Sequence, residues 1–188
     1  LCESSIEAPQ MIKICESLVQ CKSLESIHFS ENEMPEAMFE VVADSLPQLT
    51  NLKHLLFYSG EAGDAGAMAI ARVLPDCKAL ESLEMSSSEV GEQGATAIFD
   101  ALPRCPTLTN VDVSCNYNCR TAVAKLLDVV FPACAGRKMF VNISQNSIGR
   151  AMMRRCETFN DENDDHSVEW DEDEYTESED ESDDGSAA

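Results

Sequence analysis

The sequence has no apolar run that approaches the roughly 20 residues needed to cross a bilayer, so we expect no membrane insertion. It also lacks a phosphate-binding loop, the glycine set of a dinucleotide site and a basic surface with interleaved aromatic residues. The formal net charge of −22 at pH 7 opposes binding to nucleic acid. These absences point away from membrane, nucleotide-cofactor and nucleic-acid-binding classes.

Positive charge is absent from the C-terminal part of the chain. Every Lys and Arg lies at or before Arg155, whereas residues 161–188 hold 15 of the 35 Asp and Glu. Like charges at this density repel one another, and few apolar residues are present to offset the entropy of ordering. The sequence therefore predicts a folded part over residues 1–155 and a disordered acidic tail over residues 156–188.

The acidic tail has two interpretations, as a solubilising segment or as a tethered polyanion that meets a basic partner. Exposed ion pairs contribute only about 0.2–1 kcal/mol each, so such a tail would mainly speed encounter. Ser178 and Ser182 precede acidic residues, as targets of acid-directed kinases do, and are candidate phosphorylation sites. The candidate partner-binding residues of the tail are Asp171, Glu172, Asp173 and Glu174.

What the sequence does contain is a pattern that recurs at a fixed period, since Leu24, Leu52, Leu80 and Leu108 follow one another at equal spacing. The copies are Leu24, Ile27, Phe29 and Asn32; Leu52, Leu55, Phe57 and Gly60; Leu80, Leu83, Met85 and Ser88; Leu108, Val111, Val113 and Asn116; and, after a slightly longer step, Lys138, Val141, Ile143 and Asn146. Self-similarity at this period, with the spacing Leu-x-x-Leu-x-Leu-x-x-Asn, is typical of leucine-rich repeats. Such repeats act through surfaces rather than pockets.

The second half of each repeat predicts a helix. Apolar residues from Ala67 to Leu74 have the spacing of one helical face, and the proline after Leu74 or Leu102 ends the helix. Equivalent helices are expected over residues 38–46 and 121–131. The predicted fold class is α/β, a leucine-rich-repeat solenoid with a curved parallel β layer inside, helices outside and a disordered acidic C-terminal tail. An ordinary α/β domain with accidental periodicity is the alternative.

The register also indicates that repeats precede residue 1. Ile14 stands one full period before Val42, and Leu1 then falls mid-repeat, at the end of a strand. Terminal repeats need a polar outer face, which this end lacks. We therefore expect about five repeats from the C-terminal portion of a longer protein.

The cysteines are predicted to be core residues rather than metal ligands or disulfides. A position that holds Leu49 in one repeat and Cys in the others is a small apolar core site. Cys115 and Cys119 have Cys-x-x-x-Cys spacing, but no second pair or nearby His completes a zinc set. We expect no metal and no cofactor, and free thiols indicate a reducing compartment, cytosol or nucleus. The cysteines of the shared position are Cys21, Cys77, Cys105 and Cys134.

Residues that flank the core positions of each strand are expected to line the inside of the curve. Their columns are Ser26, His54, Ser82, Asn110 and Phe140; His28, Leu56, Glu84, Asp112 and Asn142; and Ser30, Tyr58, Ser86, Ser114 and Ser144. These mixed, polar columns predict a protein-docking face, and we assign no catalytic residue. The candidate partner-binding residues on this face are His28, His54, Tyr58, Glu84, Asp112 and Asn142.

Two pairs on this face have chemical alternatives. His28 and His54 occupy different columns, with no triad partner or third metal ligand, which favours surface histidines. Glu84 and Asp112 are neighbours in one column, and paired carboxylates can do acid–base work. An open sheet does not exclude water, however, so an acidic docking patch is favoured.

Asparagines close several of the predicted strands. We expect the side chains of Asn32, Asn116 and Asn146 to satisfy backbone groups in the turns, which is a structural role. Gly60 and Ser88 stand at the same position and are expected to interrupt this ladder.

The last two repeats resemble those of a known family. The stretch Leu108–Tyr117 with Arg120–Leu127 looks like the penultimate repeat of plant-type Ran GTPase-activating proteins, and Lys138–Asn146 looks like the final one. Repeats of the ribonuclease-inhibitor-like class followed by an acidic tail are similar to the arrangement in this family. The resemblance covers about residues 20–150, with departures at Asn118 and Lys138.

The resemblance implies a regulator of a partner enzyme rather than an enzyme. Family members accelerate GTP hydrolysis by the small GTPase Ran, in nucleocytoplasmic transport, by ordering Ran's own glutamine without an arginine finger. Their key contacts come from N-terminal repeats, so this chain is expected to be a weak activator or none. The expected setting is a monomer in the cytoplasm or at the cytosolic face of the nuclear envelope, bound to a Ran-like GTPase or another protein with a basic surface. The alternative is a generic leucine-rich adaptor, a cytosolic receptor fragment or an actin-regulatory cap.

Overall fold

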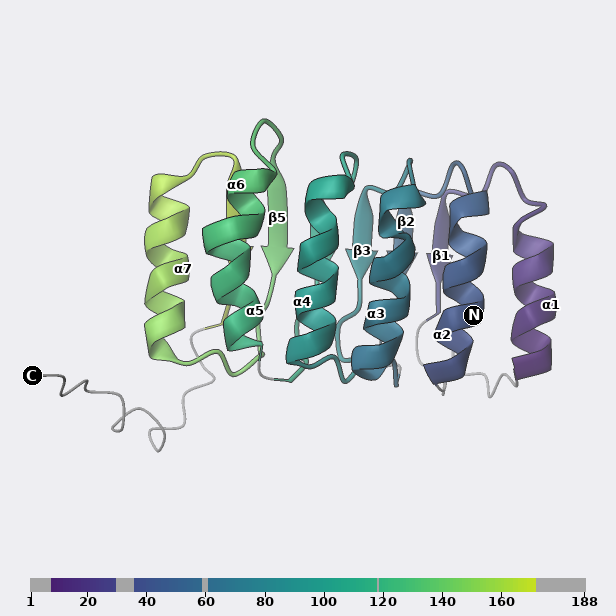
Figure 1. The fold of residues 1–188 in the computed structure, drawn as a ribbon, viewed down its shortest axis with the longest axis horizontal. Helices are drawn as coiled ribbons and strands as arrows, with labels where there is room; N and C mark the ends of the chain where they lie inside the picture. The colour runs from purple at the N-terminus through teal and green to yellow at the C-terminus, as the bar shows by residue number, and fades with distance from the viewer. Residues whose placement is uncertain (1–7, 30–35, 59–60, 118, 172–188) are drawn as a thin grey trace, which may run out of the picture.

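The computed structural model describes residues 8–29, 36–58, 61–117 and 119–171 (Figure 1). The strands are β1 (Ser26–His28), β2 (His54–Leu56), β3 (Ser82–Glu84), β4 (Asn110–Asp112), β5 (Met139–Asn142) and β6 (His166–Glu169). The α-helices are α1 (Ala8–Leu18), α2 (Glu36–Ser45), α3 (Gly63–Val73), α4 (Glu92–Ala101), α5 (Arg120–Lys125), α6 (Phe131–Ala133) and α7 (Arg150–Glu162). Tighter 3₁₀ turns form η1 (Leu46–Gln48), η2 (Leu74–Asp76) and η3 (Leu102–Arg104), and η4 (Leu126–Val130) is a π-helical turn.

The strands form one parallel sheet in sequence order, from β1 to β6. Ser26 lies opposite His54, His54 opposite Ser82 and Ser82 opposite Asn110, so the pairing register equals the period of the sequence repeat. The next pair, Asn110 with Phe140, reproduces the longer last step of the sequence pattern. Parallel neighbours need a crossover connection, and each crossover here carries a helix. The fold is therefore α/β with a six-stranded parallel sheet.

The helices lie side by side in one layer that covers one face of the sheet (Figure 1). The middle residue of each short strand is buried beneath this layer, as at Leu55 and Leu83. Ring stacking continues the core from one repeat to the next, since the Phe29 and Phe57 rings have centroids 5.4 Å apart. The opposite face of the sheet carries the outward-pointing residues, which we call the open face.

Leu-Pro pairs end the helices as the sequence predicts. Helices α2, α3 and α4 stop at the residue before Leu46, Leu74 and Leu102, and the proline then sits in the first turn of a 3₁₀ segment. Proline disfavours α-helix at the preceding residue, and the 3₁₀ turn reverses the chain toward the next strand.

Small residues set the distance between neighbouring helices. A Cβ atom at Gly94 would lie 2.8 Å from the Cβ of Ala67, so α4 packs against α3 at a distance that a larger residue would prevent. Ala67 and Ala69 are buried, in agreement with the apolar helical spacing predicted from Ala67 to Leu74.

The predicted boundary between folded part and tail at residue 155 is wrong. Helix α7 continues to Glu162, and residues 166–169 form β6, which pairs with β5. Cys156 and Val168 are buried in the core, so this segment has the apolar contacts that its acidic composition concealed. The rest of the predicted tail, residues 172–188, lies outside the described residues.

The outer edge of β6 is capped by a side chain of α7. The Asn160 amide nitrogen donates to the Val168 carbonyl at 2.8 Å, and the Val168 N–H donates to Asn160 Oδ1 at 3.0 Å. The carbonyls of Asp165 and Glu169 accept hydrogen bonds from the N–H groups of Met139 and Ile143. Because backbone groups alternate in direction along a strand, those of Val168 face away from β5. Asn160 therefore takes the place of a further strand at this residue.

Within the described part of the chain, none of the helices has the length and apolar character needed to cross a membrane.

Candidate functional site

The open face is built from two register columns that the strand pairing defines. One column holds Ser26, His54, Ser82, Asn110, Phe140 and Ser167, and the other holds His28, Leu56, Glu84, Asp112, Asn142 and Glu169. The predicted neighbours in both columns are correct. The structure adds Ser167 and Glu169, which the sequence interpretation assigned to the tail.

Sequence reasoning missed these two residues because they follow an acidic stretch. The available signal was the alternation of residue types along His166–Glu169. In the structure His166 and Val168 point into the core, whereas Ser167 and Glu169 point out. The pairing of Val168 with Val141 also continues the core column of the preceding strands.

An acidic network runs across β4 and β5 on the open face. Asp112 Oδ1 accepts hydrogen bonds from the Ser114 N–H at 2.8 Å and from the Ser114 hydroxyl at 2.6 Å. Asp112 Oδ2 accepts from the Asn142 amide at 2.9 Å, and Asn142 Oδ1 accepts from the Ser144 N–H at 3.0 Å. These bonds fix the side chains of Asp112 and Asn142 in place.

Glu84 extends this network onto β3. Its Oε1 accepts a hydrogen bond from the Ser86 hydroxyl at 3.1 Å, and its backbone lies opposite that of Asp112. Neighbouring strands are about 4.8 Å apart, so two carboxylates lie side by side. Like charges on adjacent strands cost stability, and the pair presents concentrated negative charge to any molecule that meets this face. We call Glu84, Asp112 and Glu169, with Asn142 between the last two, the acidic column.

The two predicted histidines are not brought together. His28 lies opposite Leu56 at the edge strand β1, whereas His54 lies in the other column, and both are exposed. In the described ranges no group of three His, Cys, Asp or Glu side chains could hold a metal ion. Both histidines are therefore surface residues of the open face.

Aromatic side chains interrupt the polar character of the open face at two places. Tyr58 follows β2 and is 42% exposed, and Phe140 on β5 is 38% exposed. Tyrosine and phenylalanine are enriched at protein interfaces, because they bury large areas with few rotatable bonds. The sequence interpretation selected Tyr58 and passed over Phe140, although both break an otherwise polar column.

The turns that follow the strands are fixed by an asparagine ladder. Asn116 Oδ1 accepts from the N–H groups of Ser88 and Val90, and its amide nitrogen donates to the carbonyls of Met85 and Val113 at 2.8 Å. Asn146 repeats the arrangement one strand on, since its Oδ1 accepts from the Asn116 N–H at 2.7 Å. The structural role predicted for these two asparagines is confirmed, while Asn32 and Gly60 lie outside the described residues.

The structure corrects in part the expectation that Ser88 interrupts this ladder, because the Ser88 side chain still contributes to it. Its hydroxyl is fully buried and lies 2.9 Å from the Phe57 carbonyl oxygen and 3.0 Å from that of Ser86. A serine hydroxyl can donate one hydrogen bond to these acceptors, so the shorter side chain replaces part of the asparagine amide.

The cysteines of the shared repeat position pack in the core, with one exception. Burial raises the pKa of the Cys77 thiol to about 12 and that of Cys105 to about 11, so both remain protonated and unreactive at neutral pH. Cys21, predicted at the same position, is exposed instead. Its turn follows α1, the first helix of the described stack, and so has a neighbouring repeat on one side only (Figure 1).

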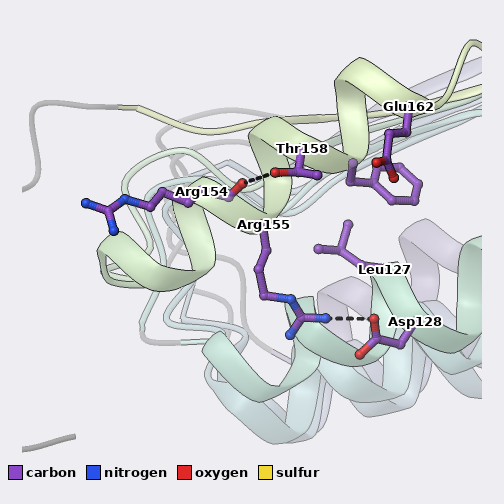
Figure 2. A pocket seen from close by; sticks show the side chains of 7 residues that line it. Leu127, Asp128, Arg154, Arg155, Thr158 and Glu162 are labelled. Atoms are coloured by element: carbon purple, nitrogen blue, oxygen red, sulfur yellow. Dashed lines mark hydrogen bonds and ion pairs between the residues drawn. The ribbon is translucent and has the colours of Figure 1, made fainter. Parts of the chain in front are cut away.

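A shallow groove of about 310 Å³ lies on the helix side, between η4 and α7. Leu127 and Phe159 supply its apolar part, and Arg155 donates to Asp128 Oδ1 at 2.7 Å (Figure 2). Figure 2 also shows that Arg154 points away from the groove. The ion pair ties Arg155 to Asp128, and Glu162 also lines the groove.

Asp171, the first acid of the predicted partner-binding run, is half-buried at the end of the described chain. The other predicted residues of the tail, Glu172, Asp173 and Glu174 with Ser178 and Ser182, lie outside the described residues.

No protein-family model matches this chain, and no curated protein matches it. Among solved structures, the chain is similar to leiomodin-1 actin-binding site 2, with a TM-score of 0.54 and 16% sequence identity. The match covers 89% of this chain and 81% of that chain. At this identity the similarity concerns the α/β fold and not a shared partner.

Proposed function

We propose that this chain forms a leucine-rich-repeat solenoid whose open face binds another protein. The pairing of residues one repeat period apart, with one helix per crossover, supports the repeat assignment. Repeat proteins of this kind bind through extended surfaces made by the stacked repeats.

The observation that carries the proposal is the acidic column on the open, solvent-facing side of the sheet. Asp112 and Asn142 are held by hydrogen bonds from serines and from each other, so the surface is pre-organised. Negative charge concentrated on one face steers a basic partner toward it and raises the association rate.

We further propose that the partner is a small GTPase of the Ran type and that the chain belongs to a regulator of that GTPase. This step depends on the resemblance of the repeats around Leu108–Asn146 and of the acidic C-terminal composition to Ran GTPase-activating proteins. The regulator would contribute a surface, and the chemistry of GTP hydrolysis would remain in the partner.

The test is direct binding of GTP-loaded Ran to the chain and to a charge-reversal variant. Glu84→Lys with Asp112→Lys should weaken binding on the order of tenfold, chiefly through slower association. The matched control is Glu16→Lys with Glu157→Lys, which reverses the same number of charges on the outer surface of α1 and α7. Equal effects of the two double variants would leave only a net-charge effect and reject the open face as the site.

A different protein partner is the competing candidate, and actin is the specific one to test. The similar structure carries the name of an actin-binding site, although the likeness concerns the fold alone. Monomeric actin in the same binding assay separates the candidates: binding of actin with no binding of GTP-loaded Ran would replace the Ran proposal.

A further inference from the structure

Phe140 is out of place in its register column. The other members, Ser26, His54, Ser82, Asn110 and Ser167, are all polar. Alternation along β5 buries Met139 and Val141 in the core and leaves the Phe140 ring on the open face, 38% exposed. Its two neighbours in the column, Asn110 and Ser167, are smaller than phenylalanine, so they leave the ring accessible to solvent.

A groove of about 390 Å³ adjoins this ring. Asn110, Phe140 and Ser167 line it from three neighbouring strands, and the loop between α7 and β6 lines it with Asp164 and Asp165. The groove therefore combines an exposed aromatic ring with carboxylates.

The charge of the groove favours a cation. Asp164 and Asp165 are exposed and outnumber the lysine among the lining residues, Lys138. Glu169 lies on the same strand as Ser167, further along the open face. A positively charged side chain above the Phe140 ring would meet the negative face of the ring, with the carboxylates of Asp164 and Asp165 in the same groove.

We propose that this groove binds an arginine side chain of a partner protein, with the guanidinium plane against Phe140 and its N–H groups directed at Asp164 and Asp165. Arginine fits better than lysine, because its planar group stacks on an aromatic ring and presents several donors to carboxylates at once. The inference depends on the proposed function, since it names the side chain that the open face selects in a protein partner.

The test uses the full chain, labelled with ¹⁵N, and two blocked pentapeptides, Gly-Arg-Gly-Arg-Gly and Gly-Lys-Gly-Lys-Gly. The peptides carry the same charge, so general attraction to the acidic chain affects them equally. Amide shifts at Asn110, Phe140 and Ser167 report on the groove, separately from those of residues 172–188. The arginine peptide should saturate the groove amides at a concentration at least threefold lower than the lysine peptide.

Two variants test the role of the ring. Phe140→Ala should weaken arginine-peptide binding about fivefold, and Phe140→Leu should weaken it similarly because leucine keeps apolar volume but has no aromatic face. Tyr117→Ala is the matched control, since Tyr117 is 58% exposed and does not line the groove. Equal binding of the two peptides at the groove amides, or full affinity in Phe140→Ala, would overturn the inference.

The outcomes also separate this inference from the proposed function. If GTP-loaded Ran binds through Glu84 and Asp112 while the groove shows no preference for arginine, only the arginine site is rejected. If the groove selects arginine but GTP-loaded Ran does not bind, the arginine site stands and the Ran proposal is rejected.

Discussion

Replacing Asn160 with alanine removes the amide that caps the outer edge of β6. Asn160 makes two hydrogen bonds to Val168, one to its carbonyl and one from its N–H. Both bonds lie on the side of the strand that faces away from β5, so the substitution leaves the bonds between β5 and β6 in place. Val168 itself is buried, and loosening of the strand would expose it to water.

The expected cost follows from the number of bonds removed. An intramolecular hydrogen bond contributes about 0.5–1.5 kcal/mol net, so losing two should cost about 1–3 kcal/mol in the free energy of unfolding. For a chain of this length, a central value of about 2 kcal/mol corresponds to a fall in Tm of about 4–8 °C. Asn163→Ala is the matched control, because Asn163 directly follows α7 and makes one local bond, to the Phe159 carbonyl of that helix.

Urea denaturation gives the global effect, and amide hydrogen exchange gives the local one. The Val168 amide should lose protection in Asn160→Ala, while the amide of Ser167, which pairs with β5, should keep it. Loss at both residues would mean that the whole strand detaches. Unchanged stability together with unchanged protection at Val168 would refute the view that Asn160 replaces a neighbouring strand.

The remaining predictions concern the ladder, a buried histidine and the thiols. Asn116→Ala should lower the free energy of unfolding, measured by urea denaturation, by about 2–4 kcal/mol, because it leaves several backbone groups of the turns unpaired. Substitution of the exposed Asn110 by alanine should lower it by less than about 0.5 kcal/mol, and equal losses would contradict the ladder. The His166 ring stacks on Phe131, with ring centroids 4.8 Å apart, near Asp165 and Arg137, and burial lowers its pKa. The unfolded state therefore binds the proton more readily, and the free energy of unfolding should fall as the pH drops below about 6.5. His166→Phe should reduce this fall between pH 7.5 and 5.5, and an unchanged pH profile would assign it to other groups. Iodoacetamide should alkylate exposed Cys21 and Cys115 in the native chain much faster than Cys77 or Cys119, whose pKa burial raises to about 12, and equal rates would contradict the buried assignments.

The sheet and most of its helices could be predicted from the sequence because the chain repeats itself. The spacing of Leu55 and Leu83 predicts which residues face the core, and the pairing register then predicts which residues share the open face. Leu-Pro pairs mark the ends of the helices, because proline acts locally and independently of packing.

The C-terminal segment could not be predicted in the same way. Residues 156–171 contain many acidic side chains, and this composition predicts disorder. The few apolar residues that pack in the core, such as Cys156 and Val168, do not change the composition enough to reverse that prediction. The capping bonds of Asn160 depend on a helix and a strand that meet only in the folded chain. The repeat pattern predicts that Phe140 lies on the open face, but the groove beside it is formed in part by the loop that precedes β6, which the sequence interpretation assigned to the tail.

The measurement that tests the central proposal most directly is an amide shift map of the ¹⁵N-labelled chain titrated with GTP-loaded Ran. Binding by the open face predicts perturbations that centre on Glu84, Asp112 and Asn142, with Arg72 on the outer surface of α3 unaffected. Perturbations confined to the helix layer, or no binding at all, would contradict the proposal.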